Sequence, residues 1–429
     1  MQTNSDVLKI RRVQRTFLLF TDALILVILF VSFMGTTCVA EENGTLLIGI
    51  YASGNTLEKD YGLVTRDFIQ VVSGAGNVSP KTLEVLAAYG GANKTGWDGV
   101  TIANLSLLRK DLDDGILGNN ASYLYRNTSA NMGDPNTLGQ FLSMIKKDFR
   151  YDRVFLIFIG HGEAYTGMLF DQNHQDDGLT ITELSDTLNK DPADLELIGF
   201  DTCLMSCLEV ASVIRKHASF LIASEESEPA DGWDYEHWIR YLSENPDAPA
   251  VNHSQVLFSK YMNMSEPGKT ISLLDLKSID FLTSNVERFG GDLTALCKTP
   301  EGMAEIHTAL MKTQQFGLNS DGKIEEATMD LYDFAENIRA LVPYLNESAG
   351  GVIEGVDKTV IYAKHDQMVP DAHGVAILSP VLINPVFFEY YMPEAFITPG
   401  WEEFVKSYLA GQDKLLSAGS SIVSSEITI

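Results

Sequence analysis

Three apolar runs in the middle of the chain are each followed at once by residues that can carry chemistry. The runs are residues 154–159, 195–200 and 220–223. The polar positions just after them include His161, Cys203 and Glu225. Short continuous apolar runs bounded by turn residues are typical of strands buried in a parallel sheet. We therefore predict three buried strands, each with polar residues at its carboxyl end.

Helical patterns alternate with these runs. Residues 57–72 have the pattern of one amphipathic helix, and residues 137–149 place Leu138, Phe141 and Ile145 on one face. Strands that alternate with helices predict an α/β three-layer sandwich with a mainly parallel central sheet. In such sheets the ligand site lies beyond the carboxyl ends of the strands. The reactive side chains are therefore expected to share one edge.

A cysteine hydrolase needs a thiolate, an imidazole that activates it and donors for the oxyanion. His161 is flanked by glycines, which let the backbone approach a substrate, and the N–H of Gly162 is a candidate oxyanion donor. Cys203 is expected near a helix N-terminus, where the pKa of a thiol falls. Cys207 and Cys297 are expected to be packing residues.

Several segments together resemble the clostripain family of cysteine peptidases, whose fold is shared with caspases. The matching segments are residues 47–58, 131–138, the apolar run into 160–162, 200–205 with Glu209, 223–226 and 232–235. With weaker agreement near residues 329–331 and 373–375, the resemblance covers most of residues 45–410. It implies a caspase-like fold and peptide-bond hydrolysis through a Cys–His dyad and an acyl-enzyme.

The resemblance also assigns roles to particular residues. It places the general acid/base on His161, the nucleophile on Cys203 and an aspartate at the floor of the substrate pocket on Asp201. In the family this acid and a second one recognise Arg or Lys at P1. Asp231 is the candidate for the second acid. Three other acids compete with it for this role: Glu225, Glu226 and Asp234. The structural alternative is that such an acid caps a helix or is a solvated loop charge.

Two further family properties can be examined in the sequence. Members often cut themselves between the histidine and the cysteine, and there Lys190 is the basic residue available as a self-processing site. Members are also commonly activated by calcium, although the chemistry itself requires no cofactor. Asp171, Asp176 and Asp177 could bind calcium, but their spacing lacks the glycine and terminal glutamate of an EF-hand loop and also suits a solvated loop. No metal ligand is assigned.

The N-terminus resembles an export signal. Basic residues precede an apolar stretch from Phe17 to Met34 that ends before Ala40. A signal peptide cleaved after Ala40 is preferred, and an uncleaved membrane anchor is the alternative. Asn-x-Ser/Thr sequons agree with export and glycosylation and begin at Asn43, Asn77, Asn93, Asn104, Asn120, Asn127, Asn252, Asn263 and Asn346. An extracellular or cell-surface location is predicted, with membrane contact only through the N-terminal segment.

Composition narrows the possible partners. A formal charge of −27 and a pI near 4.6 argue against nucleic acid, which needs clustered Lys and Arg. Protein or peptide substrates with a basic P1 residue would suit such a surface. The alternative from another class is a non-catalytic surface-binding protein that retains the peptidase scaffold, although retention of both His161 and Cys203 argues against it.

The predicted domain organisation has four parts. Residues 1–40 are the signal peptide or anchor, 41–250 the caspase-like catalytic domain, 251–410 a C-terminal α/β part packed on it, and 411–429 a polar, disordered tail.

Overall fold

The computed structural model describes residues 45–76, 82–107, 123–190, 194–318, 324–381 and 398–425. These residues belong to one compact unit that begins at Gly44. The predicted export segment, residues 1–40, lies outside the described residues. Within the described ranges, no helix combines the length and the apolar character needed to cross a membrane.

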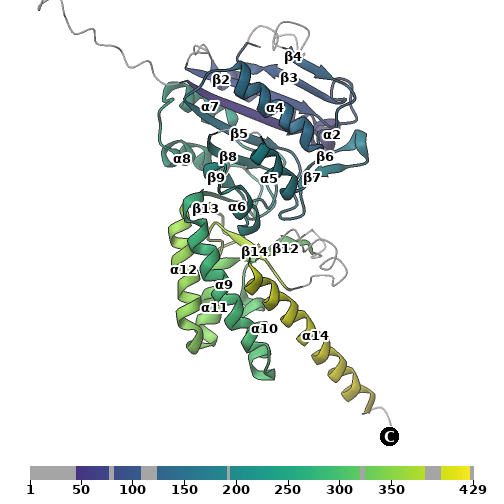
Figure 1. The fold of residues 1–429 in the computed structure, drawn as a ribbon, viewed down its shortest axis with the longest axis vertical. Helices are drawn as coiled ribbons and strands as arrows, with labels where there is room; N and C mark the ends of the chain where they lie inside the picture. Colours follow the sequence, from purple (N-terminus) through teal and green to yellow (C-terminus); the bar gives the residue numbers. More distant parts are fainter. Residues whose placement is uncertain are drawn as a thin grey trace, which may run out of the picture. The chain divides into compact units, whose positions relative to one another are not determined.

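A large mixed sheet forms the centre of this unit (Figure 1). Nine strands of the described residues pair in the order β13-β10-β9-β8-β5-β1-β2-β3-β4. The five inner strands are parallel, and the two strands on each side of them are antiparallel. The strands are β1 (Leu46–Ser53), β2 (Leu83–Gly90), β3 (Val100–Asn104), β4 (Tyr123–Asn127), β5 (Arg153–Ile159), β8 (Leu195–Asp201), β9 (Ala218–Ala223), β10 (Thr270–Asp275) and β13 (Val360–His365).

Helices cover both faces of the sheet, so the fold is the predicted three-layer α/β sandwich. Alternate strand residues enter two separate apolar cores. One core is completed by α4 (Pro135–Asp148), α5 (Ile181–Lys190) and α6 (Leu208–Ile214). The other is completed by α3 (Leu63–Ala75), α7 (Tyr235–Glu244) and α8 (Ala250–Tyr261).

The C-terminal part contributes two strands to the central sheet. Strands β10 and β13 extend the sheet beyond β9, and a small second sheet contains β11 (Gln315–Leu318), β12 (Ile324–Asp330) and β14 (Ala376–Leu378). The hydroxyls of Ser206 and Ser272 lie 2.8 Å apart, and both are within hydrogen-bonding distance of the Gly374 carbonyl oxygen. The remaining helices are α9 (Ile279–Leu296), α10 (Pro300–Lys312), α11 (Leu331–Leu341), α12 (Asn346–Thr359) and α14 (Pro399–Ser425).

Two predicted elements differ from the structure. The single helix expected over residues 57–72 is two helices, α2 (Asn55–Tyr61) and α3, because Gly62 adopts φ 68° between them. The tail predicted to be disordered from residue 411 is instead helical as far as Ser425, as the continuation of α14. The first turns of α14 are packed through Trp401 and Phe404, and extending an existing helix costs little compared with starting one.

Candidate active site

Strands β5 and β8 lie side by side and place the two predicted reactive residues at the same edge. They pair in parallel, with Ile159 opposite Asp201 at their carboxyl ends. The Gly160 N–H then donates to the Asp201 carbonyl oxygen at 3.3 Å. His161 and Cys203 each follow within two residues of this paired position, so the sheet brings their two turns together.

The two turns are in close contact through Gly162. A Cβ atom at this position would lie 2.6 Å from the Cys203 carbonyl oxygen and 2.9 Å from Thr202 Cβ, so only glycine fits without movement. Gly162 also pairs with Met168 in an isolated antiparallel bridge. The hydrogen bonds of this bridge are made by neighbouring residues rather than by the Gly162 N–H. The Gly162 N–H is therefore not part of this bridge.

Cys203 lies on a tight turn after β8, not at the start of a helix. Leu204 adopts φ 66°, a left-handed conformation unusual for leucine, and α6 begins only at Leu208, with Cys207 as its buried N-cap. The Sγ atom of Cys203 accepts the Glu228 backbone N–H at 3.3 Å. Burial raises the pKa of the Cys203 thiol above its ordinary value. The expectation of a thiol acidified by a helix N-terminus is therefore wrong, because burial outweighs the single backbone donor.

His161 is contacted by the first turn of α2. Its Nε2 atom and Thr56 Oγ1 lie 2.8 Å apart, within hydrogen-bonding distance. Burial lowers the pKa of His161, and the negative charge of Asp176 partly opposes this shift. Both shifts favour the uncharged form of the side chain, for the imidazole and for the Cys203 thiol.

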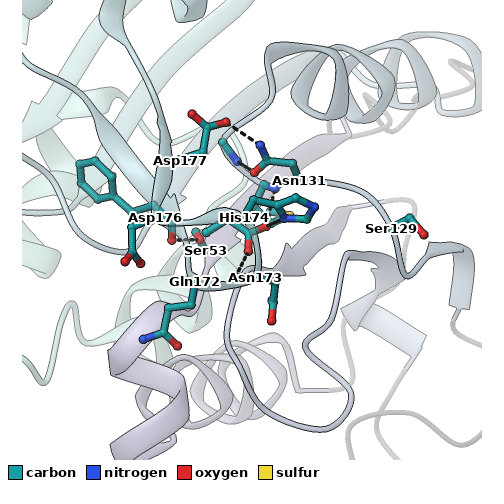
Figure 2. Close-up of polar contacts among 12 residues, drawn as sticks. Ser53, Ser129, Asn131, Gln172, Asn173, His174, Asp176 and Asp177 are labelled. Carbon is teal, nitrogen blue, oxygen red and sulfur yellow. Dashed lines mark hydrogen bonds and ion pairs between the residues drawn. The ribbon is translucent and has the colours of Figure 1, made fainter.

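A network of polar contacts holds the end of β1 and the first turn of α2, which carries Thr56. Figure 2 shows the part of this network around Ser53 and Asp176. The Ser53 hydroxyl donates to the Phe170 carbonyl oxygen at 2.8 Å, and the Asn55 side chain donates to the same oxygen at 3.0 Å. Asn55 also donates to Asp176 Oδ1 at 3.2 Å. Strand β6 (Met168–Asp171) and the turn that leads to β7 (Asp177–Leu179) thus hold the start of α2, which carries Thr56.

The three acidic residues considered for calcium are engaged in separate contacts. Asp171 is buried and accepts the backbone N–H groups of Met132 and Asn173, while the side chain of Asn131 donates to Asp177 (Figure 2). Asp176 receives the bond from Asn55 described above. Across the described ranges no group of three His, Cys, Asp or Glu side chains is arranged to hold a metal ion.

Asp201 is buried behind the nucleophile among donors. Its Oδ2 atom accepts the Tyr235 hydroxyl at 2.7 Å and the Trp233 N–H at 3.3 Å. The ring N–H of Trp233 donates to Glu228 Oε1 at 3.4 Å. Burial raises the pKa of Asp201, while the hydrogen bonds from Tyr235 and Trp233 act in the opposite direction. The predicted pocket floor is thus a buried acid with aromatic neighbours.

Asp231 is placed differently from Asp201. It is about half exposed and forms a 2.5 Å ion pair with Arg66. Glu225 is buried and accepts the Gly374 N–H, and Asp234 caps the start of α7. Glu228, in the same loop, donates its backbone N–H to Cys203 Sγ and accepts the Trp233 ring N–H, and the sequence reasoning missed it. The only available signal was its position inside the acidic loop after β9.

Comparison with known proteins identifies the family. The model of the clostripain family, Peptidase C11, matches residues 50–417. The chain belongs to the clostripain family. The turns that carry His161 and Cys203 both fall within the matched range.

Relatives and solved structures agree with this membership. Clostripain from Hathewaya histolytica is 24% identical over 288 residues, which cover 55% of this chain and 54% of that protein, so the chain spans about half the length of the curated relative it matches. A secreted C11 cysteine protease from Bacteroides thetaiotaomicron, solved with an irreversible peptide inhibitor, superposes with a TM-score of 0.60 at 15% identity and covers 85% of this chain and 98% of its own. An inactive zymogen C11 protease from Parabacteroides distasonis gives 0.59 at 18% identity, with 82% and 97% covered. These clostripain-family structures confirm the fold.

Proposed function

We propose that this clostripain-family protein is a cysteine endopeptidase that uses Cys203 as nucleophile and His161 as general acid/base. The observation that carries the proposal is the parallel pairing of β5 and β8, which sets the two turns against each other at one sheet edge. A thiol and an imidazole beside backbone N–H groups are the components that acyl transfer requires.

The proposed reaction starts from the uncharged pair. His161 takes the thiol proton as Cys203 Sγ attacks the scissile carbonyl carbon, and the resulting imidazolium protonates the leaving amine. Thr56, at Nε2, fixes the ring and leaves Nδ1 for this exchange. The Gly162 N–H is proposed as a donor to the oxyanion. Water then hydrolyses the thioester, with His161 as base.

The proposed substrates are proteins or peptides with Arg or Lys at P1. A guanidinium or ammonium group entering behind Cys203 would meet the buried Asp201 carboxyl, and a buried carboxylate is strongly stabilised by such a partner. Because the similar protease from Bacteroides thetaiotaomicron is a secreted protein, we also propose an extracellular or cell-surface location, reached through the N-terminal segment.

Peptide cleavage tests this proposal directly. Among fluorogenic peptides with Arg, Lys, Asp, Asn or Leu at P1, we expect the Arg and Lys peptides to have kcat/KM values at least ~100-fold above the others, because only they place a cation at Asp201. The panel is run with and without calcium, since family members are commonly activated by it. Equal rates for all five peptides would contradict the basic preference, and no hydrolysis of any would contradict the peptidase assignment.

Self-processing is proposed at Lys190, the exposed last residue of α5. If the proposed activity cuts there, purified wild-type protein should yield two chains, one that ends at Lys190 and one that begins at the next residue. Cys203→Ala protein should remain one chain, because it lacks the nucleophile. Intact mass spectrometry distinguishes the two outcomes, and identical masses for both proteins would end the idea.

A further inference from the structure

A polar cavity lies beside α6 and apart from the proposed catalytic residues. Its volume is about 600 Å³, and it is lined by residues of α5, α6, α9 and the start of α14. Neither His161 nor Cys203 is among them. Small-molecule sites typically have volumes of about 300–1,000 Å³, whereas one water molecule takes up about 30 Å³ of liquid. The cavity therefore has room for a small organic ligand.

Two buried residues of α6 give this cavity polar atoms that lack partners. Glu209 and Ser212 both line it, and each is more than nine-tenths buried. Among the described residues, Ser212 Oγ and Glu209 Oε2 have no hydrogen-bond partner. The other carboxyl oxygen of Glu209 accepts the Leu378 N–H at 2.9 Å, and the thiol of Cys207, a weak donor, also approaches this carboxyl group. Since buried polar groups are almost always hydrogen-bonded, the two orphaned oxygens indicate a missing partner.

The wall of the cavity next to α6 is basic. Arg215, Lys216 and His217 follow one another in the sequence and all line it. Arg215 forms a 2.5 Å ion pair with Asp280, so its charge is already compensated. Lys216 is exposed, and no carboxylate within the described ranges forms an ion pair with it. After burial, its positive charge is the second cause that lowers the pKa of His217. An uncompensated cation beside a cavity favours an anionic ligand.

The acids that line the cavity do not oppose such a ligand equally. Glu287 Oε2 accepts the Gly400 N–H at 2.7 Å, which occupies this carboxylate at the start of α14. Burial raises the pKa of Glu209 to about 7, so near neutral pH a large fraction of this carboxyl group is protonated and can donate a hydrogen bond. Together with the Ser212 hydroxyl and the Lys216 ammonium, the cavity offers the donors that carboxylate and phosphate oxygens accept.

We propose that this cavity is a binding site for a small molecule that carries a carboxylate or phosphate group. The oxyanion meets the charge of Lys216, and polar atoms of the same molecule pair with Ser212 and Glu209 on the buried side. The site is separate from the proposed peptidase chemistry and does not depend on it. Because the ligand contacts helices that come together only in the folded chain, its binding also stabilises the fold.

Calorimetric titration of the purified full chain tests the proposal. The probes are succinate, inorganic phosphate and the neutral analogue succinamide, all at one fixed ionic strength. We expect at least one of the two oxyanions to bind with a Kd of roughly 1 mM or lower and succinamide to bind at least ~10-fold more weakly. Tighter binding of succinate identifies a carboxylate ligand, and tighter binding of phosphate a phosphorylated one. At about 100 times Kd, the bound probe should raise the thermal unfolding midpoint by about 3 °C.

Three variants locate the binding. Lys216→Gln should raise the Kd of the oxyanion roughly tenfold, because the compensating cation is lost. Ser212→Ala should raise it about threefold to tenfold while the protein stays folded, since the hydroxyl has no partner to lose. Lys312→Gln is the matched control, at an exposed position of α10 outside the cavity, and should bind as wild type does.

The remaining outcomes would overturn the site. Absence of binding by succinate and phosphate up to roughly 10 mM would show that the cavity holds only water. Equal Kd values in wild type, Lys216→Gln and Ser212→Ala would show that the anions bind elsewhere on the surface, and equal binding of succinamide would remove the role of charge. Since none of these measurements uses peptide hydrolysis, failure here would leave the peptidase proposal untouched.

Discussion

Replacing Cys203 with alanine should lower kcat for peptide hydrolysis by ~10⁴-fold or more without unfolding the protein. The side chain supplies the attacking sulfur, and nothing else in the proposed site can form the acyl-enzyme. Its sulfur accepts one backbone N–H among the described residues, that of Glu228, and the residue is partly exposed, so the fold should be kept. Steady-state hydrolysis of a P1-Arg peptide and the thermal unfolding midpoint measure the two effects.

Two further variants make this result specific. Cys297→Ala removes another partly exposed free cysteine far along the chain, in α9's C-cap, and should keep full activity. His161→Ala combined with Cys203→Ala should be hardly worse than either alone, because the two side chains act as one unit. Additive losses, or full activity in Cys203→Ala, would show that a different nucleophile is used.

Replacing Asp201 with asparagine should lower kcat/KM for a P1-Arg peptide by ~10³-fold and leave a P1-Leu peptide within a few-fold of wild type. A buried cation without its anion loses several kcal/mol of stabilisation, whereas a neutral side chain never used that charge. The asparagine side-chain oxygen can still accept the Tyr235 hydroxyl, so the pocket should keep its shape. Michaelis parameters for both peptides provide the measurement.

Asp231→Asn is the informative comparison for this prediction. Asp231 is half exposed and already paired with Arg66, so its loss should cost the P1-Arg peptide about tenfold at most. Equal losses in the two variants would mean that Asp231 contacts the P1 cation, as the family pattern first implied. Asp247→Asn, at an exposed position after α7, should change neither peptide.

The sequence was sufficient to predict the sheet edge on which His161 and Cys203 meet. Apolar runs that end abruptly determine where strands stop, and parallel strands bring their ends together whatever the connections between them. Local turn geometry was not predictable in the same way. The left-handed Leu204 and the start of α6 at Leu208 depend on contacts with residues far away in the chain, such as the Glu226 carbonyl oxygen that accepts the Leu204 N–H.

The acidic loop after β9 shows the same limit. Glu228 and Asp231 are three residues apart in this loop, and composition cannot tell which of the two carboxyl groups turns inward. The loop passes through Gly232 at φ 63°, directly over the Asp201 carboxyl, and the Glu228 carboxyl group contacts Trp233 while Asp231 pairs with Arg66. Such a path is decided by long-range packing of Trp233 and Tyr235 rather than by local preference.

The pairing of β10 with β9 limits how far this chain can be shortened from its C-terminal end. A chain ending near residue 250 would lose β10, and the backbone of β9 from Phe220 to Ala223 would become an open edge able to add strands from other copies. The buried hydroxyl of Ser206 would also lose its neighbour Ser272. The residues before 250 therefore depend on the C-terminal part to close the sheet and are not expected to form a self-sufficient module.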